Sequence, residues 1–429
     1  RSSDPDGVPD YSLLLDGLLA EREQGITTDI AWRYVDARRR RLVFVDAPGH
    51  EQYTRNMASG ASHVDVAMML VDARQGVKAQ TRRHAAILEI VGVRRVILAV
   101  NKMDLVGFSE RIFREIEQDL AALAARFRFV DARAVPVSAK HGDNVARASS
   151  ATPWYAGPTV LDLLDASASA ADAADGPFCY PVQTVLRSGF DFRGLAGTVA
   201  SGRITVGDMI VEGAAGLQAK VRRIVTMDGD RRAARSGDAV VLELDRDLDI
   251  ARGAVLASAA DPATMTRSLR ARLVWLADAP LAPGQRLLFR TATDLAPIMR
   301  HEVLSRLDLT SLVEEPASGL AVNELATMEI SLGRQVALDR FDVISATGRF
   351  VLVDALTGVT VAAGVVISMS NAAGQEDTTV FQLTDAILFA GVCADLGRDD
   401  PEFAKRATAA VELLLTAGVA VTRVDSKSC

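Results

Sequence analysis

Short runs of branched apolar residues recur through the first ~170 residues, separated by stretches with a helical period. Runs rich in Val, Leu and Ile are typical of buried parallel strands. They are Leu42–Val45, Val66–Val71, Arg95–Val100 and Ala134–Val137. The helical stretches are Thr81–Val91 and Glu110–Phe127. This alternation predicts a doubly wound α/β domain, which we place at residues 1–172.

The pattern changes after Ser167–Gly176, a stretch rich in Ala, Ser and Asp that is typical of a linker. From Phe178 onward, short strands alternate with Gly- and Asp-containing turns. Short strands at this spacing predict small β-barrels. We expect one barrel at residues 177–264 and a second at residues 267–368.

The composition narrows the class of protein. The chain has 429 residues, a net charge of −7 and a pI near 5.4, which argues against a surface that coats nucleic acid. Its three cysteines, Cys179, Cys393 and Cys429, have no metal-ligand spacing and fit a reducing compartment. The sequence has no apolar run long enough to span a bilayer and no signal-peptide core. We expect a cytoplasmic protein without a nucleic-acid or membrane partner.

The first of the strand-like runs is followed by the pentapeptide D-A-P-G-H at residues 46–50. At such a strand end, Asp46 is placed to hold Mg²⁺ through water, since Mg²⁺ prefers oxygen ligands. Gly49 would let its backbone N–H approach a γ-phosphate, and His50 is the candidate for orienting the attacking water. Taken alone, D-x-P-G more often forms an ordinary turn, and His50 is equally a packed loop residue.

The strand Arg95–Val100 is followed by N-K-M-D, a pattern suited to reading guanine. The Asp104 carboxylate can accept two N–H bonds from the guanine edge, and such a site rejects bases that leave it unpaired. Asn101 can tie neighbouring loops together, while the aliphatic stem of Lys102 can cover the base plane. The alternative is a strand-end turn with a solvated charge pair.

A third loop, Ser138-Ala139-Lys140, follows the strand Ala134–Val137. It would complete a base pocket by pointing backbone N–H groups at the guanine carbonyl. The tripeptide alone carries little information, but the three loops occur in a fixed order about 35 to 55 residues apart. That order and spacing predict a site for GTP or GDP with Mg²⁺.

Two further features concern the phosphates. Thr27 precedes a strand-like stretch, where a threonine hydroxyl can close over Mg²⁺ when a γ-phosphate is present; an N-cap or an ordinary strand residue is the alternative. The phosphate-binding run G-x-x-x-x-G-K-[ST] does not occur between Arg1 and Cys429. We therefore expect that this loop precedes Arg1 in the natural protein or that internal segments of the natural chain are missing from the sequence.

Several runs together resemble a known family. Translation-factor-like GTPases share the runs A-E-R-E-Q-G-I-T at Ala20–Thr27, D-A-P-G-H at residues 46–50 and N-K-M-D at Asn101–Asp104. Other runs are more similar to the large subunit of bacterial sulfate adenylyltransferase (CysN type). These are Glu51–Met57, Gln80–His84, Gly142–Val145 and Pro153–Tyr155. The likeness extends from about Asp10 to Ile367.

This resemblance implies a P-loop-type GTPase domain followed by two β-barrels, as in elongation factor Tu. In the family, GTP hydrolysis drives adenylyl transfer from ATP to sulfate, giving adenosine 5′-phosphosulfate (APS) and pyrophosphate. The adenylyl-transfer site lies on a separate small ATP-binding subunit (CysD type). The chain would thus be the energy-coupling subunit of an ATP sulfurylase.

The residues 379–424 resemble parts of an APS kinase, which is fused to this GTPase in some bacteria. The likeness rests on Val380–Thr384, Gly391–Gly397 and Leu413–Gly418. It departs from that family where Asp385 directly follows the first strand, and where Asp400 and Phe403 replace an Arg and an Asn. Active kinase chemistry does not follow from these residues, although Asp395 can survive as a site residue.

Two alternatives stay open on the sequence alone. An elongation factor that delivers aminoacyl-tRNA has the same GTP-binding loops. A degenerate kinase segment could also serve as a regulatory module that binds a 3′-phosphorylated product. Copurification with a small ATP-binding subunit would favour sulfate activation over the elongation-factor alternative.

Overall fold

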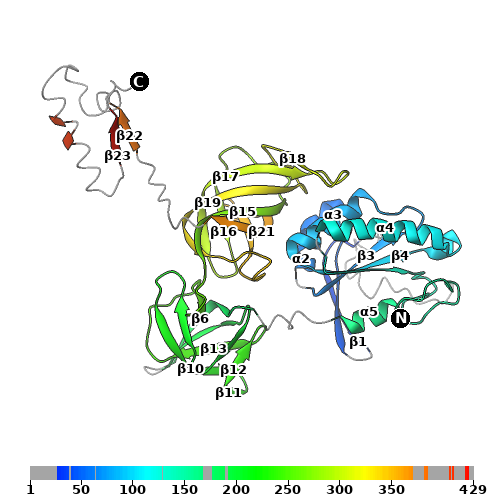
Figure 1. Cartoon of the computed structure of the whole chain (residues 1–429), viewed down its shortest axis with the longest axis horizontal. Helices are drawn as coiled ribbons and strands as arrows, with labels where there is room; N and C mark the ends of the chain where they lie inside the picture. The colour runs from blue at the N-terminus through cyan, green and yellow to red at the C-terminus, as the bar shows by residue number, and fades with distance from the viewer. Residues whose placement is uncertain are drawn as a thin grey trace. The chain divides into compact units, whose positions relative to one another are not determined.

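The computed structural model describes most of the chain (Figure 1). The described residues are 27–37, 40–62, 64–127, 129–167, 176–188, 192–370, 381–384, 405–406, 408–409 and 421–424. The chain divides into two compact units, Arg1–Ser370 and Asn371–Cys429. None of the helices in the described part is both long and apolar enough to cross a membrane.

A parallel sheet forms the centre of the N-terminal part, with helices on both of its faces (Figure 1). The sheet order is β3 (Val66–Asp72), β4 (Arg95–Asn101) and β5 (Asp131–Pro136). Val96, Leu98 and Val100 of β4 pack with α3 (Ala79–Val91) and α4 (Glu110–Phe127). The alternate residues Ile97 and Ala99 pack towards α5 (Val160–Ala166). Burial on both faces explains why β4 is almost continuously apolar.

The run Leu42–Val45 does not form the parallel strand that we expected. It lies in β2 (Arg41–Asp46), which pairs antiparallel with β1 (Ala31–Asp36). Only four residues separate β1 from β2, and a connection this short joins antiparallel strands, whereas parallel strands need a long crossover. The hairpin also leaves Tyr34 71% exposed and Val43 45% exposed, so this sheet is not buried on both faces.

Short helical segments follow the strands at their carboxyl ends. Beyond β2, the 3₁₀ turn η2 (Glu51–Tyr53) leads into α2 (Thr54–Ala61). Beyond β4, the 3₁₀ turn η3 (Met103–Val106) is entered through Lys102, which has a left-handed φ of 63°. These segments determine where the polar side chains of the loops point.

Two closed antiparallel barrels follow the α/β domain. The sheet of the first contains β6 (Cys179–Ser188), β7 (Phe192–Thr198), β9 (Met209–Glu212), β10 (Gln218–Thr226), β11 (Gly229–Arg231), β13 (Ala239–Leu244) and β14 (Val255–Ser258). In the same part of the chain, β8 (Arg203–Thr205) and β12 (Ala233–Arg235) pair as a separate two-stranded sheet. The second contains β15 (Met265–Trp275), β16 (Leu287–Arg290), β17 (Leu295–Leu307), β18 (Glu314–Pro316), β19 (Leu325–Ala337), β20 (Arg349–Asp354) and β21 (Thr360–Ser370). Pairing of β9 with β10 closes the first, and pairing of β16 with β17 closes the second. Closure removes the unpaired edges that an open sheet would expose.

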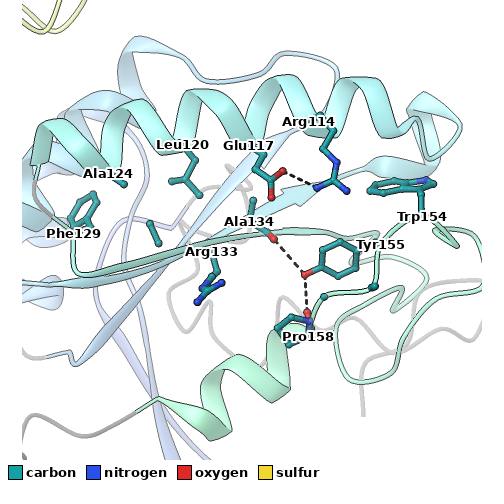
Figure 2. A pocket seen from close by; sticks show the side chains of 14 residues that line it. Arg114, Glu117, Leu120, Ala124, Phe129, Arg133, Ala134, Trp154, Tyr155 and Pro158 are labelled. Carbon is teal, nitrogen blue, oxygen red and sulfur yellow. Dashed lines mark hydrogen bonds and ion pairs between the residues drawn. The ribbon is translucent and has the colours of Figure 1, made fainter.

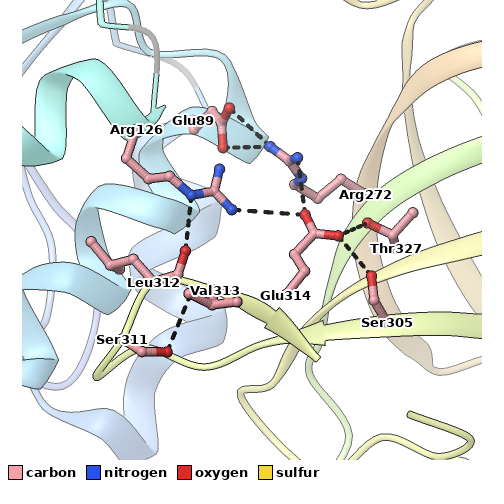
Figure 3. Close-up of polar contacts among 9 residues, drawn as sticks. All are labelled: Glu89, Arg126, Arg272, Ser305, Ser311, Leu312, Val313, Glu314 and Thr327. Atoms are coloured by element: carbon pink, nitrogen blue, oxygen red, sulfur yellow. Dashed lines mark hydrogen bonds and ion pairs between the residues drawn. The ribbon is translucent and has the colours of Figure 1, made fainter. Parts of the chain in front are cut away.

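Charged side chains join the second barrel to the α/β domain (Figure 3). Arg272 of β15 donates to both carboxylate oxygens of Glu89 on α3, at 3.0 and 2.9 Å. It also lies 3.4 Å from Glu314 of β18, which in turn is 3.8 Å from Arg126 of α4. Burial alone would raise the pKa of Glu314, but the Ser305 hydroxyl and the two guanidinium groups lower it. The carboxylate therefore stays ionised between its two cations.

The end of α3 lies against an aromatic residue of the second barrel. Gly92, which follows α3 with a φ of 90°, has no room for a Cβ because the Phe341 ring occupies that space. The guanidinium groups of Arg94 and Arg349 lie 5.7 and 5.5 Å from the centre of this ring. Arg349 also donates to the carbonyl oxygen of Ser62 just beyond α2. Cations near the C-terminal ends of helices interact favourably with the unpaired carbonyls there.

In the C-terminal unit, β22 (Phe381–Thr384) and β23 (Val421–Val424) pair in parallel. Parallel strands require a long crossover between them. The other kinase-like runs, including Gly391–Gly397 and Leu413–Gly418, lie outside the described residues.

Candidate functional site

The loops after β4 and β5 are tied together by one amide side chain. The Oδ1 atom of Asn101 accepts the backbone N–H of Lys102 at 2.8 Å and that of Ala139 at 3.0 Å. Backbone hydrogen bonds from Val137 to Val100 and from Met103 to Val137 extend the link. The N-K-M-D and S-A-K loops therefore meet at one edge of the sheet, which is where α/β proteins bind ligands.

The side chain of Lys102 is held by a carboxylate at the end of β3. Asp72 pairs in register with Asn101, and its Oδ2 atom lies 3.1 Å from Lys102 Nζ. Arg74 also forms an ion pair with Asp72 at 2.7 Å. The Arg74 guanidinium, together with the Lys102 ammonium, holds the pKa of the Asp72 carboxyl well below its usual range. Asp72 therefore limits the positions open to the Lys102 stem.

Asp104 lies in the first turn of η3, with its side chain only 20% exposed. The Nε2 atom of His141 lies 3.9 Å from Asp104 Oδ2. Ser138 is fully buried, and its hydroxyl has no protein partner among the described residues. Lys140 follows on the exposed side of the loop. The Asp104 carboxylate thus lies beside His141, the residue that directly follows the S-A-K loop.

The D-A-P-G-H loop lies beside the start of α3. Gln80, in the first turn of that helix, donates from Nε2 to the carbonyl oxygen of Gly49 at 2.9 Å. The His50 side chain is exposed, and its Nδ1 atom accepts the backbone N–H of Gln52 at 3.4 Å. The helix α3 begins beyond the carboxyl end of β3, and β3 pairs in parallel with β4. The loop bonded to Gln80 and the N-K-M-D loop therefore lie at the same end of the parallel strands.

The residues that follow this loop are bonded to the second barrel. The carbonyl oxygen of Glu51 accepts a hydrogen bond from Asn323 at 3.1 Å. Arg55 of α2 donates to the carbonyl oxygens of Leu276 and Thr360. With the Arg349 contact to Ser62, both ends of α2 are attached to the barrel. A displacement of α2 would therefore break contacts with the barrel.

Thr27 and Asp46 belong to the same hairpin region. Asp46 ends β2 opposite Ala31, and the carbonyl oxygen of Thr28 accepts the side-chain amide of Asn56 on α2 at 2.9 Å. Within the described ranges there is no group of three or more His, Cys, Asp or Glu residues suited to holding a metal ion. A cation here would take much of its coordination from water or a ligand, as Mg²⁺ usually does.

A cavity of about 630 Å³ lies elsewhere in this domain, beneath α4 (Figure 2). Its walls include Arg114, Glu117, Trp154 and Tyr155. The Tyr155 hydroxyl donates to the carbonyl oxygen of Pro158, and burial raises the pKa of Tyr155 to about 12. None of the residues that line this cavity belongs to the three loops, so the cavity is not part of the candidate site.

Sequence reasoning missed the residues that support the loops. Asp72 and Gln80 carry side chains of common types at positions without a recognised pattern. Their roles depend on parallel register and on the path of α3, which a linear sequence does not display. The run Gln80–His84 is distinctive in the sequence only as part of a resemblance.

Comparison with known proteins gives consistent matches. Residues 3–173 match the family model of the elongation factor Tu GTP-binding domain, and residues 268–367 match that of the GTP-eEF1A C-terminal domain-like family. Sulfate adenylyltransferase subunit 1 of Teredinibacter turnerae is 42% identical over 376 residues, covering 87% of this chain and 80% of that protein. The same subunit of Laribacter hongkongensis is 43% identical over 370 residues, covering 86% and 77%. The bifunctional enzyme NodQ of a Rhizobium species is 42% identical over 360 residues, covering 84% of this chain but 57% of NodQ.

Proposed function

The chain belongs to the family of sulfate adenylyltransferase subunit 1, and on this basis we propose that it is the GTP-hydrolysing subunit of an ATP sulfurylase. In this role it couples GTP hydrolysis to adenylyl transfer from ATP to sulfate, which forms APS and pyrophosphate. The observation that carries the proposal is the junction of the N-K-M-D and S-A-K loops at Asn101.

We assign the guanine base to this junction. The Asp104 carboxylate accepts the two N–H groups of the guanine edge. The backbone N–H groups of Ser138 and Lys140 face its carbonyl oxygen, while the N–H of Ala139 stays bonded to Asn101 and holds the loop beside the base. Lys102, restrained by Asp72, covers one face of the base with its aliphatic stem. A base that lacks the guanine donor pattern leaves the partly buried Asp104 unpaired, which is unfavourable.

We assign the phosphate end to the D-A-P-G-H loop and to Thr27. Gly49 offers its backbone N–H to the γ-phosphate, and His50 orients the attacking water. Asp46 and Thr27 would hold Mg²⁺ together with water and phosphate oxygens, since Mg²⁺ prefers oxygen ligands and keeps much of its hydration. Bound Mg²⁺ would neutralise charge on the phosphates.

The partner in this proposal is a small ATP-binding subunit of the CysD type, which would hold ATP and sulfate. The attachment of α2 to the second barrel supports a coupling role. The segment after His50 cannot move without disturbing the barrel, so changes at the γ-phosphate can reach surfaces outside the α/β domain.

We also propose that residues 379–424 form part of an APS-kinase-like segment. The parallel pairing of β22 with β23 supports an α/β arrangement, and NodQ is a bifunctional relative. Formation of 3′-phosphorylated APS by the full-length protein from ATP and APS would test whether the segment is active.

GTP turnover by the full-length protein tests the main proposal, measured with and without the small subunit, ATP and sulfate. We expect the complete mixture to stimulate hydrolysis and to form APS. His50→Ala should slow hydrolysis about 10- to 100-fold while GTP affinity changes little, because water positioning acts on the transition state. GTP binding without stimulation by the mixture would contradict the sulfurylase role. Unchanged turnover in His50→Ala would return His50 to a packing role.

A further inference from the structure

The amide of Gln80 can adopt only one orientation in its surroundings. Its Oε1 atom faces Arg83 Nη1 at 2.8 Å, and a guanidinium can only donate. Its Nε2 atom faces the Gly49 carbonyl oxygen at 2.9 Å, and a carbonyl can only accept. Both neighbours therefore require the same assignment of oxygen and nitrogen. Arg83 is itself fixed by an ion pair with Glu51 at 2.9 Å.

This orientation determines the protonation of His84. The Nε2 atom of His84 lies 2.9 Å from Gln80 Nε2, which is a donor, so the histidine nitrogen must accept. His84 is then neutral, with its proton on Nδ1. Burial, followed by repulsion from Arg83, lowers the pKa of His84, although the Gly49 carbonyl opposes this in part. The hydrogen-bond geometry and the electrostatics thus agree on a neutral imidazole.

Gln80 restrains the peptide group on which His50 depends. The Gly49 carbonyl and the His50 N–H belong to one planar peptide, so fixing the carbonyl oxygen also fixes the direction in which His50 leaves the loop. Gly49 provides no side-chain contact that could do this. A Cβ at that position would meet only His84 Cε1, at 3.9 Å.

We propose that Gln80 is a positioning residue for GTP hydrolysis, which holds the Gly49–His50 peptide in the orientation that aims His50 at the attacking water. Arg83 and His84 support it by fixing its amide. The inference rests on the proposed role of His50 in hydrolysis. It assigns no contact between Gln80 and the nucleotide.

An ordinary structural role for Gln80 would give different results. If the side chain only stabilised the start of α3, its loss would change stability or nucleotide affinity, and its effect would add to that of any other substitution. If it acts through His50, its loss lowers the hydrolysis rate at constant affinity, and the effect disappears once His50 is removed.

Gln80→Glu is the direct test in the full-length protein, because it keeps the shape but replaces the donor to Gly49 with a carboxylate. We expect single-turnover hydrolysis of GTP to fall about 10- to 100-fold, as for a small misplacement of a catalytic group. The affinity for GTP should change less than about threefold. Gln118→Glu, an exposed position on α4, introduces the same charge and should leave both quantities unchanged.

The double variant His50→Ala/Gln80→Glu separates the inference from the proposed function. We expect it to hydrolyse GTP as slowly as His50→Ala alone. A further full loss of rate would overturn the positioning role. If His50→Ala has no effect, the proposed role of His50 fails first. If His50→Ala is slow but Gln80→Glu and Gln80→Ala are both normal, only the positioning role of Gln80 fails.

Discussion

Asp104→Asn exchanges a carboxylate that accepts two hydrogen bonds for an amide of the same shape. In the proposed site, the amide nitrogen would face a donor of guanine, so one bond is lost outright and the other loses its charge. A hydrogen bond to a charged group contributes about 1.5–3 kcal/mol, and an unpaired buried donor costs about 1–3 kcal/mol more. Because the Asp104 side chain is 20% exposed, we take the lower part of this range, about 3–4 kcal/mol in total.

That free energy corresponds to a loss of about 10²- to 10³-fold in GTP affinity. Xanthine presents a carbonyl where guanine presents an amino group, so the variant should gain affinity for XTP. Equilibrium competition of GTP and XTP against labelled GDP, in the full-length protein, measures both changes. Asp119→Asn on the exposed face of α4 is the matched control and should behave as wild type. A variant that keeps GTP affinity within about threefold and still rejects XTP would refute our placement of the base.

Two further predictions concern His84 and Arg272. The folded-state pKa of His84 lies below the ordinary value of 6.5, so its link to Gln80 should be intact above that pH and lost as pH falls through the lowered pKa. The rate of GTP hydrolysis should therefore fall at acidic pH. The variant His84→Gln keeps a hydrogen-bond acceptor but does not titrate, so it should remove this fall. A fall in rate that persists unchanged in the variant would contradict the assignment. Arg272→Ala leaves Glu89 and Glu314 without this cation and should weaken docking of the barrel by about 1.5–3 kcal/mol. Hydrogen exchange in α3 should then accelerate, and unchanged exchange there would show that the ion pairs contribute little.

Periodicity predicted the strands β3, β4 and β5 and the helices α3 and α4 of the α/β domain, but it did not indicate the short helices α2 and α5. The helical stretch Glu110–Phe127 coincides with α4, because its apolar residues recur on one face and become buried. The pairing direction of β2 was predicted wrongly. Apolar content reports burial, whereas the direction of pairing depends on the length of the connection between β1 and β2.

Some residues of the site could be predicted from the sequence and others could not. Asn101 and Asp104 follow strands in a known order, so a linear pattern indicates them. Gln80 and His84 act through atoms that face each other across a helix turn and towards another loop, and Asn323 reaches Glu51 from 272 residues away. Such pairs depend on packing between elements, and one sequence contains no direct signal for them.

Gly92 has a consequence for how the α/β domain and the second barrel can diverge in sequence. Its left-handed φ already disfavours any other residue, and the Phe341 ring occupies the position of a side chain. Even the methyl group of an alanine at position 92 would clash with Phe341 of the second barrel. A larger residue at position 92 therefore requires that Phe341 first be replaced or displaced.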